Sequence, residues 1–402
     1  MDGIVLLRNP VQEYAWGSQT FIQQLVKDAA ARGRPAAELW MGTHPLGPSE
    51  VLWEGRWMFL SQLIQESPER ILGEGIARKF RNQLPFLFKV LAAAKPLSIQ
   101  CHPNLKQAEA GFRREESCGL GLRSTERNYK DQNHKPEIFC ALRPSWVLKG
   151  FRNLSEIRFL IDKLGLSSAM GGISTALGKG LTKSLRAFFT AFIELDHPRQ
   201  KELTSEAVKS IRKTADREPS FAWVVKLSRL FPDEPMVLSP LLLNLIHLKP
   251  GDAVMINPGT LHAYLKGAGV ELMANSDNVL RAGLTRKTKN IAELLRVVNF
   301  HQEDPITVEA ASLDVGERLY PSEAAEFALS LISTTKNTPH VSFKAHSLEI
   351  MFCVAGRGRI TDLEQGGTLS VARGVSFLVP AFVGQYRIDG RVAVYKASVP
   401  LQ

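Results

Sequence analysis

The chain has 402 residues, of which 44% are hydrophobic and 22% are charged, and its formal net charge at pH 7 is +10. This composition is that of an ordinary globular protein, and the length suggests two or three domains. No stretch approaches the ~18 consecutive apolar residues that a membrane-spanning helix needs, so we expect no membrane insertion.

The N-terminal residues and the cysteines indicate a cytoplasmic protein. The N-terminus, MDGIVLLRNP, lacks the basic start and the apolar core of ~7–15 residues that a signal peptide needs. The four cysteines form no CxxC pair, which argues against a disulfide framework and against a thiolate zinc site. The lysines and arginines are scattered, with no run of five or more, so we expect no nucleic-acid partner.

Three regions of the sequence differ in periodicity. Residues 1–150 contain short apolar runs broken by Gly, Pro and Asn, which predict strands and loops with helices around Ser18–Ala31 and Met58–Phe80. In residues 154–230, apolar side chains recur at helical spacing, which predicts about four helices linked by turns such as GGIS and DREPS. From Pro240 onwards the pattern returns to short strands, apart from the helical stretch AELLRVVNF. The sequence therefore predicts a mainly β protein with a helical insertion.

The segment KPLSIQCHP, residues 95–103, ends an apolar run on polar side chains. Side chains in a strand alternate between two faces, so Ser98, Gln100 and His102 share one face while Cys101 points to the other. Polar groups on a buried face need a partner. Other protein groups, water, or a metal with its ligand could each supply one.

Two further motifs add candidate ligands. In DQNHKPEIF, Lys135 and Glu137 share one face of a strand while His134 points the other way, and we interpret His134 as a turn or capping residue. In KPGDAVMINPGTLHAY, a strand over Ala253–Ile256 and a Pro-Gly turn lead to His262. This arrangement resembles the second motif of the cupins, which are β barrels that hold a metal in their mouth. A single histidine is more often structural, so the motif alone is not decisive.

Together, these motifs supply a set of metal ligands: Gln100, His102, Glu137 and His262. Two histidines and a carboxylate leave an open position on zinc for water or substrate. With iron, the same set resembles the oxygenase triad. A glutamine oxygen is a less common fourth ligand, and the spacing alone leaves both metals open.

Two cations stand in apolar surroundings. Lys89 lies within FLFKVL, where it either pairs with a buried group or extends its amine outward to solvent. Arg281 lies in NVLRAG, where it could hold a phosphate or form an ion pair with Glu271 or Asp277. No glycine-rich phosphate loop is present, so basic side chains would have to hold any phosphate.

Several motifs occur in one order along nearly the whole chain: YAWGS, AELWMGTHP, LPFLFKVL, KPLSIQCHP, NHKPE, NPGTLHAYL, GVELMANSDNVLRAGLTRK and, more weakly, EIMFCVAGRG. Together they resemble the type I mannose-6-phosphate isomerases, or phosphomannose isomerases, which are zinc enzymes of the cupin superfamily. The resemblance implies one zinc ion per chain, held by Gln100, His102, Glu137 and His262. It also implies an active-site role for Arg281. Further pocket residues implied by the resemblance are Trp16, Lys89, Ser98, Lys135, Glu271, Asp277 and Lys287.

The reaction that the resemblance implies is the interconversion of mannose 6-phosphate and fructose 6-phosphate through a cis-enediol. Zinc would polarise the substrate oxygens, and the general base would be Glu271 or Lys135. The substrate phosphate would be held by Arg281 and Lys287, with Lys89 and Ser98. We therefore expect a small phosphosugar as the partner, and a monomer that serves mannose metabolism and GDP-mannose biosynthesis. The alternatives are another metal-dependent cupin, such as an iron dioxygenase or a different sugar-phosphate isomerase, and a non-catalytic sugar-binding cupin.

The cupin interpretation divides the chain into three parts. Residues 1–150 and 240–304 would form the catalytic barrel, and residues 151–239 a helical insertion beside it. Residues 305–402 would form a second barrel without a metal, because no histidine follows the turn in GVSFLVPAFVGQY.

Three positions depart from the family pattern. Cys101 stands where the family often has alanine, and we expect it to pack away from the metal. Arg286 in LTRK replaces a common proline beside Lys287, and Lys149 in WVLKGFR replaces an apolar or cysteine residue without touching a ligand.

Overall fold

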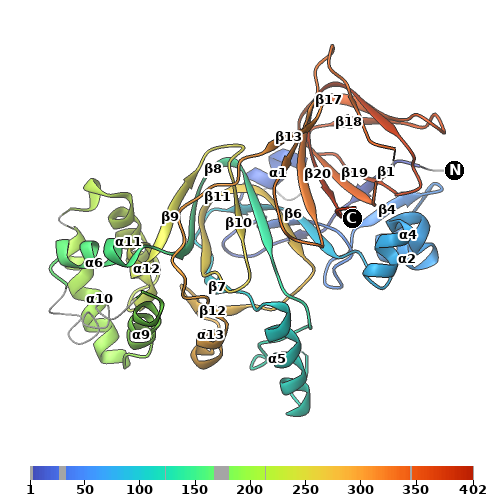
Figure 1. Cartoon of the computed structure of the whole chain (residues 1–402). Helices are drawn as coiled ribbons and strands as arrows, with labels where there is room; N and C mark the ends of the chain where they lie inside the picture. The colour runs from blue at the N-terminus through green and yellow to red at the C-terminus, as the bar shows by residue number, and fades with distance from the viewer. Residues whose placement is uncertain are drawn as a thin grey trace.

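The computed structural model describes residues 3–26, 33–122, 124–166, 181–212, 214–344 and 346–401, without the side chains of residues 181–183. Its strands form two sheets, and a block of helices lies beside the first of them (Figure 1). The predicted mainly β fold with a helical insertion is thus confirmed. The end of the first predicted helix, residues 27–31, and the predicted GGIS turn lie outside the described residues. In the part of the chain that the structure describes, no helix has the length and apolarity that crossing a bilayer requires.

The first sheet carries the polar motifs. Among the described residues it has nine strands in the order β10-β8-β11-β6-β3-β2, with β9 on β8, β7 on β11 and β12 on β7. These strands are β2 (Val11–Gln12), β3 (Glu38–Met41), β6 (Phe86–Ala93), β7 (Ile99–Cys101), β8 (Glu137–Phe151), β9 (Leu243–Leu248), β10 (Ala253–Ile256), β11 (His262–Ala274) and β12 (Leu280–Gly283). Each strand pair is antiparallel. The predicted strand over Ala253–Ile256 is confirmed as β10.

The second sheet has eleven strands among the described residues, in the order β13-β14-β15-β20-β17-β19-β1-β4-β5, with β16 on β20 and β18 on β17. They are β1 (Val5–Arg8), β4 (Glu50–Trp53), β5 (Arg56–Phe59), β13 (Ala311–Asp314), β14 (Glu317–Tyr320), β15 (Ala328–Ser333), β16 (His340–Val341), β17 (Glu349–Asp362), β18 (Thr368–Ala372), β19 (Ser376–Val379) and β20 (Tyr386–Ser398). The N-terminal strand β1 joins it by pairing Val5 with Leu378. The first 59 residues therefore contribute strands to both sheets. The division expected from the sequence had assigned all of them to the catalytic part.

The described helices fall into two groups, one outside and one within the predicted insertion (Figure 1). Those outside the insertion are α1 (Phe21–Val26), α2 (Leu60–Glu66), α3 (Pro68–Leu72), α4 (Glu74–Lys79), α5 (Leu105–Ser117) and α13 (Ile291–Val297). Those of the insertion are α6 (Leu154–Lys163), α9 (Leu181–Ile193), α10 (His197–Arg212), η2 (Ala215–Arg217), α11 (Pro219–Leu230), η3 (Pro235–Leu238) and α12 (Ser239–Leu242). Most of the stretch AELLRVVNF lies in α13, as its periodicity predicted, and the helix ends at Val297.

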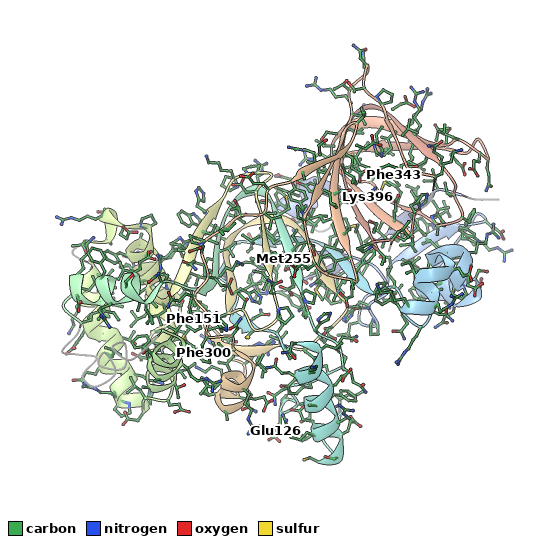
Figure 2. All side chains as sticks on the ribbon, viewed as in Figure 1. Glu126, Phe151, Met255, Phe300, Phe343 and Lys396 are labelled. Atoms are coloured by element: carbon green, nitrogen blue, oxygen red, sulfur yellow. The ribbon has the colours of Figure 1, made fainter. Side chains whose placement is uncertain are left out.

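The helical insertion and the first sheet share one hydrophobic core. Phe151, at the end of β8, stacks on Phe300 with ring centroids 5.7 Å apart and meets Phe189 of α9 edge-on at 5.2 Å. Figure 2 shows Phe151 and Phe300 at the junction between the strands and the helices. Aromatic pairs of this kind stabilise a junction beyond the area they bury, so the insertion is fixed against the sheet.

One face of strand β6 packs towards the second sheet. Phe88 and Val90 belong to the same core cluster as Leu329 and Ile350 of the second sheet. Because side chains alternate along a strand, Lys89 then faces the interior of the first sheet. The same alternation decides which side chains of the first sheet reach the pocket that is lined by Lys89, Glu137 and His262.

Helix α5 packs closely against the ring of Tyr129 at Gly111. A Cβ at this position would lie 2.3 Å from the ring of Tyr129, which is fully buried and donates its hydroxyl proton to Glu293 at 2.6 Å. We expect Gly111→Ala to lower the free energy of unfolding by about 1–3 kcal/mol, because the ring must move. Urea denaturation measures the change. Gly75→Ala in α4 is the matched control, since its Cβ would meet nothing within 4 Å, and a Gly111→Ala protein as stable as this control would contradict the prediction.

Candidate metal centre and active site

Strand alternation brings polar side chains from different strands to one inner surface. On β7, Ile99 and Cys101 pack into the core shared with the helices, while Gln100 lines the pocket inside the first sheet. Gln100 pairs with His262 of β11 on one side and with Arg281 of β12 on the other. Cys101 is fully buried and burial raises the pKa of its thiol, so its predicted packing role is confirmed.

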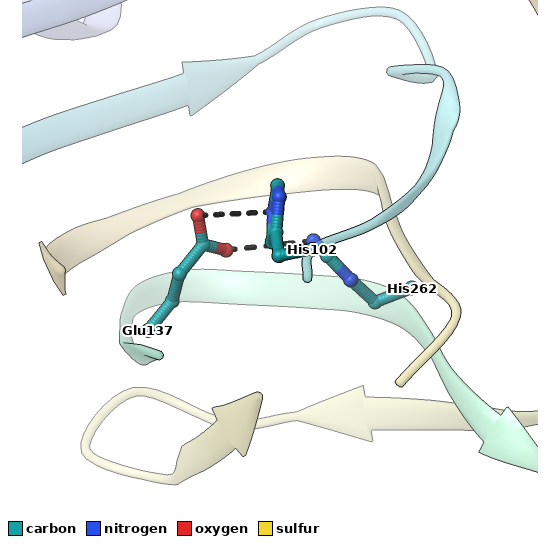
Figure 3. A group of neighbouring side chains, drawn as sticks. All are labelled: His102, Glu137 and His262. Atoms are coloured by element: carbon teal, nitrogen blue, oxygen red, sulfur yellow. Dashed lines mark ion pairs between the residues drawn. The ribbon is translucent and has the colours of Figure 1, made fainter. Parts of the chain in front are cut away.

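His102, Glu137 and His262 form a buried cluster in which all three side chains point toward one another (Figure 3). Their ligand atoms all lie within 4.8 Å of one another. Nε2 of His102 lies 3.3 Å from one carboxylate oxygen of Glu137, and Nε2 of His262 lies 3.4 Å from the other. The structure thus brings together three of the four side chains predicted as metal ligands.

Backbone carbonyls orient both imidazole rings. Nδ1 of His102 lies 2.7 Å from the carbonyl oxygen of Asn278, and Nδ1 of His262 lies 3.0 Å from that of Thr260. A carbonyl oxygen only accepts, so in neutral rings Nδ1 carries the proton and Nε2 presents its lone pair toward Glu137. Nε2 of His102 is buried and has no hydrogen-bond partner among the residues that the structure describes. A nitrogen lone pair that faces a carboxylate is repelled by its negative charge unless a cation lies between them. The donor set therefore fits a divalent metal.

The electrostatics of the cluster also suit metal binding. Burial, followed by the charge of Lys135, lowers the pKa of His102 to about 4. Burial acts to raise the pKa of Glu137, but Lys135 and His102 outweigh it and hold that pKa well below its ordinary value. Nζ of Lys135 lies 3.2 Å from Glu137 Oε1. A neutral imidazole and an ionised carboxylate are the protonation states that metal ligands need.

Gln100, the fourth predicted ligand, lies beside the cluster. Its Nε2 donates to Ser98 Oγ at 3.2 Å, which leaves Oε1 as the oxygen that can face a metal. Ser98 and Gln100 line the same pocket as Glu137 and His262. The shared strand face predicted for this segment is therefore confirmed.

Lys89 is buried between two carboxylates. Its Nζ lies 3.3 Å from Glu271 and 3.7 Å from Glu38, and 5.4 Å from the centre of the Trp40 ring. Strand register explains this, because Lys89 pairs with Glu271 on β11 and with Trp40 on β3. Burial acts to lower the pKa of Lys89, but Glu38 and Glu271 outweigh it and raise that pKa. The alternative in which Lys89 extends to solvent is therefore wrong.

Glu271 and Tyr264 complete the pocket wall from β11. Burial raises the pKa of Glu271; Lys89 opposes this shift, and Glu137 adds to it. Burial and the charge of Glu271 raise the pKa of Tyr264 well above its ordinary value. Tyr264 therefore keeps its hydroxyl proton and can act as a donor in the pocket.

Arg281 and Lys287 lie outside this pocket. Arg281 is half-buried, burial lowers its pKa, and it lines a cavity of about 470 Å³ that also contains Lys289. Within the described residues no carboxylate pairs with it, since Glu271 pairs with Lys89 and Asp277 with His44. Lys287 is exposed, and burial and the charge of Arg281 lower its pKa. Lys89 and Ser98 line the metal pocket, and Arg281 is joined to it through its pairing with Gln100.

The remaining predicted residues lie at the edges of the site. Trp16 stacks on Tyr14 with centroids 5.7 Å apart and packs against the apolar residues inside the first sheet. Asp277 lies 3.2 Å from Nε2 of His44. Burial acts to raise the pKa of Asp277, but the hydrogen bond and charge of His44 outweigh it and lower that pKa. His134 lies 2.8 Å from Glu326, outside the metal cluster.

Sequence reasoning missed three residues that the structure places at the site: Glu38, Tyr264 and Asn278. Glu38 stands within the apolar run AELWM, where an isolated acid is a signal for a buried pair. Tyr264 follows His262 by two residues, so strand alternation alone puts both on one face. Asn278 had no local signal, because the partners of its side chain and of its carbonyl lie more than 140 residues away.

These features define a class of protein. A buried Glu-His-His cluster lies inside an antiparallel sheet, next to two buried lysines and two further carboxylates. Paired titratable groups with opposed pKa shifts are typical of enzyme active sites, so these features are those of a metal-dependent enzyme built on antiparallel sheets.

Comparisons with known proteins identify the family. A family model for the catalytic domain of type I phosphomannose isomerase matches residues 4–154, and one for the cupin domain of mannose-6-phosphate isomerase matches residues 318–398. The mannose-6-phosphate isomerase of Salmonella typhimurium is 38% identical over 363 residues, which cover 89% of this chain and 90% of that protein. The human mannose-6-phosphate isomerase is 35% identical over 314 residues, which cover 72% of this chain and 71% of that protein.

A solved structure agrees with these relatives. The mannose 6-phosphate isomerase of Salmonella typhimurium, bound to fructose 6-phosphate and zinc, matches with a TM-score of 0.90 and 34% identity over 100% of both chains. The chain belongs to the type I mannose-6-phosphate isomerase family, and the resemblance found in the sequence is confirmed. The dioxygenase and the non-catalytic cupin are not favoured by these relatives.

Proposed function

We propose that this chain interconverts mannose 6-phosphate and fructose 6-phosphate with one zinc ion held by Gln100, His102, Glu137 and His262. The observation that carries the proposal is the pair of imidazole Nε2 atoms facing the two oxygens of Glu137. A relative that matches the whole chain binds fructose 6-phosphate and zinc. When bound, zinc would polarise the substrate oxygens as a Lewis acid.

The remaining chemistry is the transfer of a proton between C1 and C2 through the cis-enediol. We assign this transfer to Glu271, because burial raises its pKa and thereby brings its carboxyl nearer to the range in which it can take up and return a proton. Lys89, 3.3 Å away, would orient that carboxyl. Lys135, the other candidate base, lies 3.2 Å from Glu137 and would position that ligand instead.

This assignment predicts different kinetics for two variants. We expect Glu271→Gln to lower kcat by about 10²–10⁴-fold with KM nearly unchanged, because a positioned base contributes on that scale. Lys135→Met is expected to weaken zinc binding in addition to lowering activity. Steady-state kinetics and metal titrations distinguish the two. A full loss of kcat in Lys135→Met at saturating zinc, with activity kept in Glu271→Gln, would assign the base to Lys135.

Arg281 and Lys287 are proposed to hold the phosphate, since Arg281 is half-buried and pairs with no carboxylate in the described residues. We expect Arg281→Ala to lower kcat/KM by about 10–100-fold, the scale of a lost hydrogen bond to a charged group. The free energy of unfolding should stay unchanged, because no ion pair is removed. Arg286→Ala, exposed in the segment that follows β12, is the control and should keep its activity. Equal losses in both variants would remove Arg281 from the site.

The test of the function is the conversion of mannose 6-phosphate to fructose 6-phosphate by the purified chain, before chelation, after chelation and after zinc is restored. We expect the activity to disappear with the chelator and to return with zinc. Activity that the chelator leaves intact would contradict the metal site. No activity in the zinc-loaded protein would contradict the isomerase function.

We also propose that the chain acts as a cytoplasmic monomer in mannose metabolism and GDP-mannose biosynthesis. The cysteines are free, which suits a reducing compartment: Cys101, Cys118, Cys140 and Cys353. In the proposed organisation, residues 305–402 support the catalytic sheet and hold no metal. Light scattering tests the monomer, and metal content above one zinc per chain would contradict this organisation.

A further inference from the structure

We propose that Asn278 is a positioning residue for the metal site, acting both on His102 and on the segment that leads to Glu137. The inference rests on the proposed zinc ion at His102, Glu137 and His262. It concerns a residue that acts through hydrogen bonds to one ligand, His102, and to the loop that leads to another, Glu137.

The backbone of Asn278 orients His102. Asn278 is fully buried in the turn between β11 and β12, and its carbonyl oxygen lies 2.7 Å from Nδ1 of His102, 176 residues away in sequence. His262 is held differently, by the carbonyl of Thr260 only two residues earlier. The direction of Nε2 in His102 therefore depends on where tertiary structure places Asn278.

The side chain of Asn278 holds the loop before Glu137. Its Oδ1 accepts from the backbone N–H groups of Lys130 at 2.7 Å and Asp131 at 3.2 Å. Its Nδ2 donates to the backbone carbonyls of Asp131 and Asn133, each at 2.9 Å. An amide supplies an acceptor oxygen and a donor with two protons, which these four bonds need together. Residues 130–133 run directly into Lys135 and Glu137, so their placement limits where that carboxylate can lie.

Asp131 closes the same arrangement from the loop side. Its Oδ1 accepts from Ser276 Oγ at 2.8 Å and from Asn278 Nδ2 at 3.1 Å, and its Oδ2 accepts from the N–H of Asp277 at 2.7 Å. The turn 276–278 and the loop 130–133 thus hold each other through side chains on both partners. We name this set of bonds the 131–278 clasp.

The physical consequence is a preformed metal site. Metal ligands from distant segments must keep their positions closely, and groups that orient them typically contribute 10–100-fold to metal affinity. Since one clasp fixes His102 and the segment carrying Glu137 together, losing it frees both ligands at once.

The test compares zinc affinity in purified full-length variants by competition with a chelator. Asn278→Asp keeps the shape and the backbone carbonyl but cannot donate to the carbonyls of Asp131 and Asn133. We expect zinc affinity to fall by about 10–100-fold, with kcat at saturating zinc changed only a few-fold. Asn9→Asp is the matched control, because the same change removes a donation to Ser376 Oγ at 2.6 Å in the second sheet. Its zinc affinity should stay within about twofold of wild type.

Two outcomes overturn the inference. Unchanged zinc affinity in folded Asn278→Asp protein, even with a lower melting temperature, would reduce Asn278 to a structural residue. If Asn278→Asp does not fold, Asp131→Ala removes the three side-chain bonds by which Asp131 holds the turn 276–278 and leaves the carbonyl of Asn278 in place; unchanged zinc affinity there shows that the clasp does not position the ligands and overturns the inference equally. Wild-type protein that binds no zinc would instead refute the proposed function, so the two failures are distinguishable.

Discussion

His262→Ala is expected to abolish the isomerase activity, lowering kcat/KM by about 10³-fold or more, which corresponds to at least ~4 kcal/mol of transition-state stabilisation. His262 supplies one of two imidazole nitrogens that face Glu137, and its side chain is 3% exposed. Without it, two protein ligands of the buried cluster remain beside Gln100. Activity and metal content, measured on the same preparation, should fall together.

His247→Ala is the control for this prediction. His247 is exposed on β9 and stacks on Trp146 with centroids 4.4 Å apart, so its loss removes a histidine without touching the cluster. The control should keep its zinc and its turnover. A His262→Ala protein that matches it in both would place the metal elsewhere in the chain.

Lys89→Met is expected to lose both stability and activity, while Lys396→Met loses stability alone. The two residues form a matched pair, because each is a buried lysine held by two glutamates. Lys89 lies in the first sheet and Lys396 in the second. Nζ of Lys396 lies 2.7 Å from Glu317 and 3.4 Å from Glu349, and Figure 2 shows it among the strands of the second sheet. For Lys396 as for Lys89, burial acts to lower the pKa, but the glutamates outweigh it and raise it.

Removing one partner from a buried ion pair leaves an uncompensated charge and costs about 3–5 kcal/mol of unfolding free energy. We expect that loss for both variants, measured by denaturant titration at pH 7. Of these two lysines, Lys89 lines the pocket with Glu271 and Glu137 and Lys396 does not, so kcat/KM should fall in Lys89→Met and stay near wild type in Lys396→Met. If both variants keep full activity per folded molecule, Lys89 has only a structural role.

Local patterns in the sequence predicted most of the elements and the inner face of the site, but the helical stretch expected around Met58–Phe80 begins in strand β5 and is divided into α2, α3 and α4. Strand alternation put Ser98, Gln100 and His102 on one face, and the structure confirms that face, because alternation is a property of the extended backbone itself. Helical spacing likewise predicted α13 and the helices of the insertion. The ligand set, however, came from family resemblance rather than from spacing, because spacing left zinc and iron open.

Only the tertiary structure decided which distant groups meet. The partners of Lys89, the pairing of Val5 with Leu378 and the bond from His102 to Asn278 each join segments far apart in sequence. No local periodicity encodes such contacts, since they depend on strand register and on how two sheets pack. The residue types and their faces were therefore determined by the sequence alone, whereas the tertiary structure determined the charge balance of the pocket and the orientation of the metal ligands.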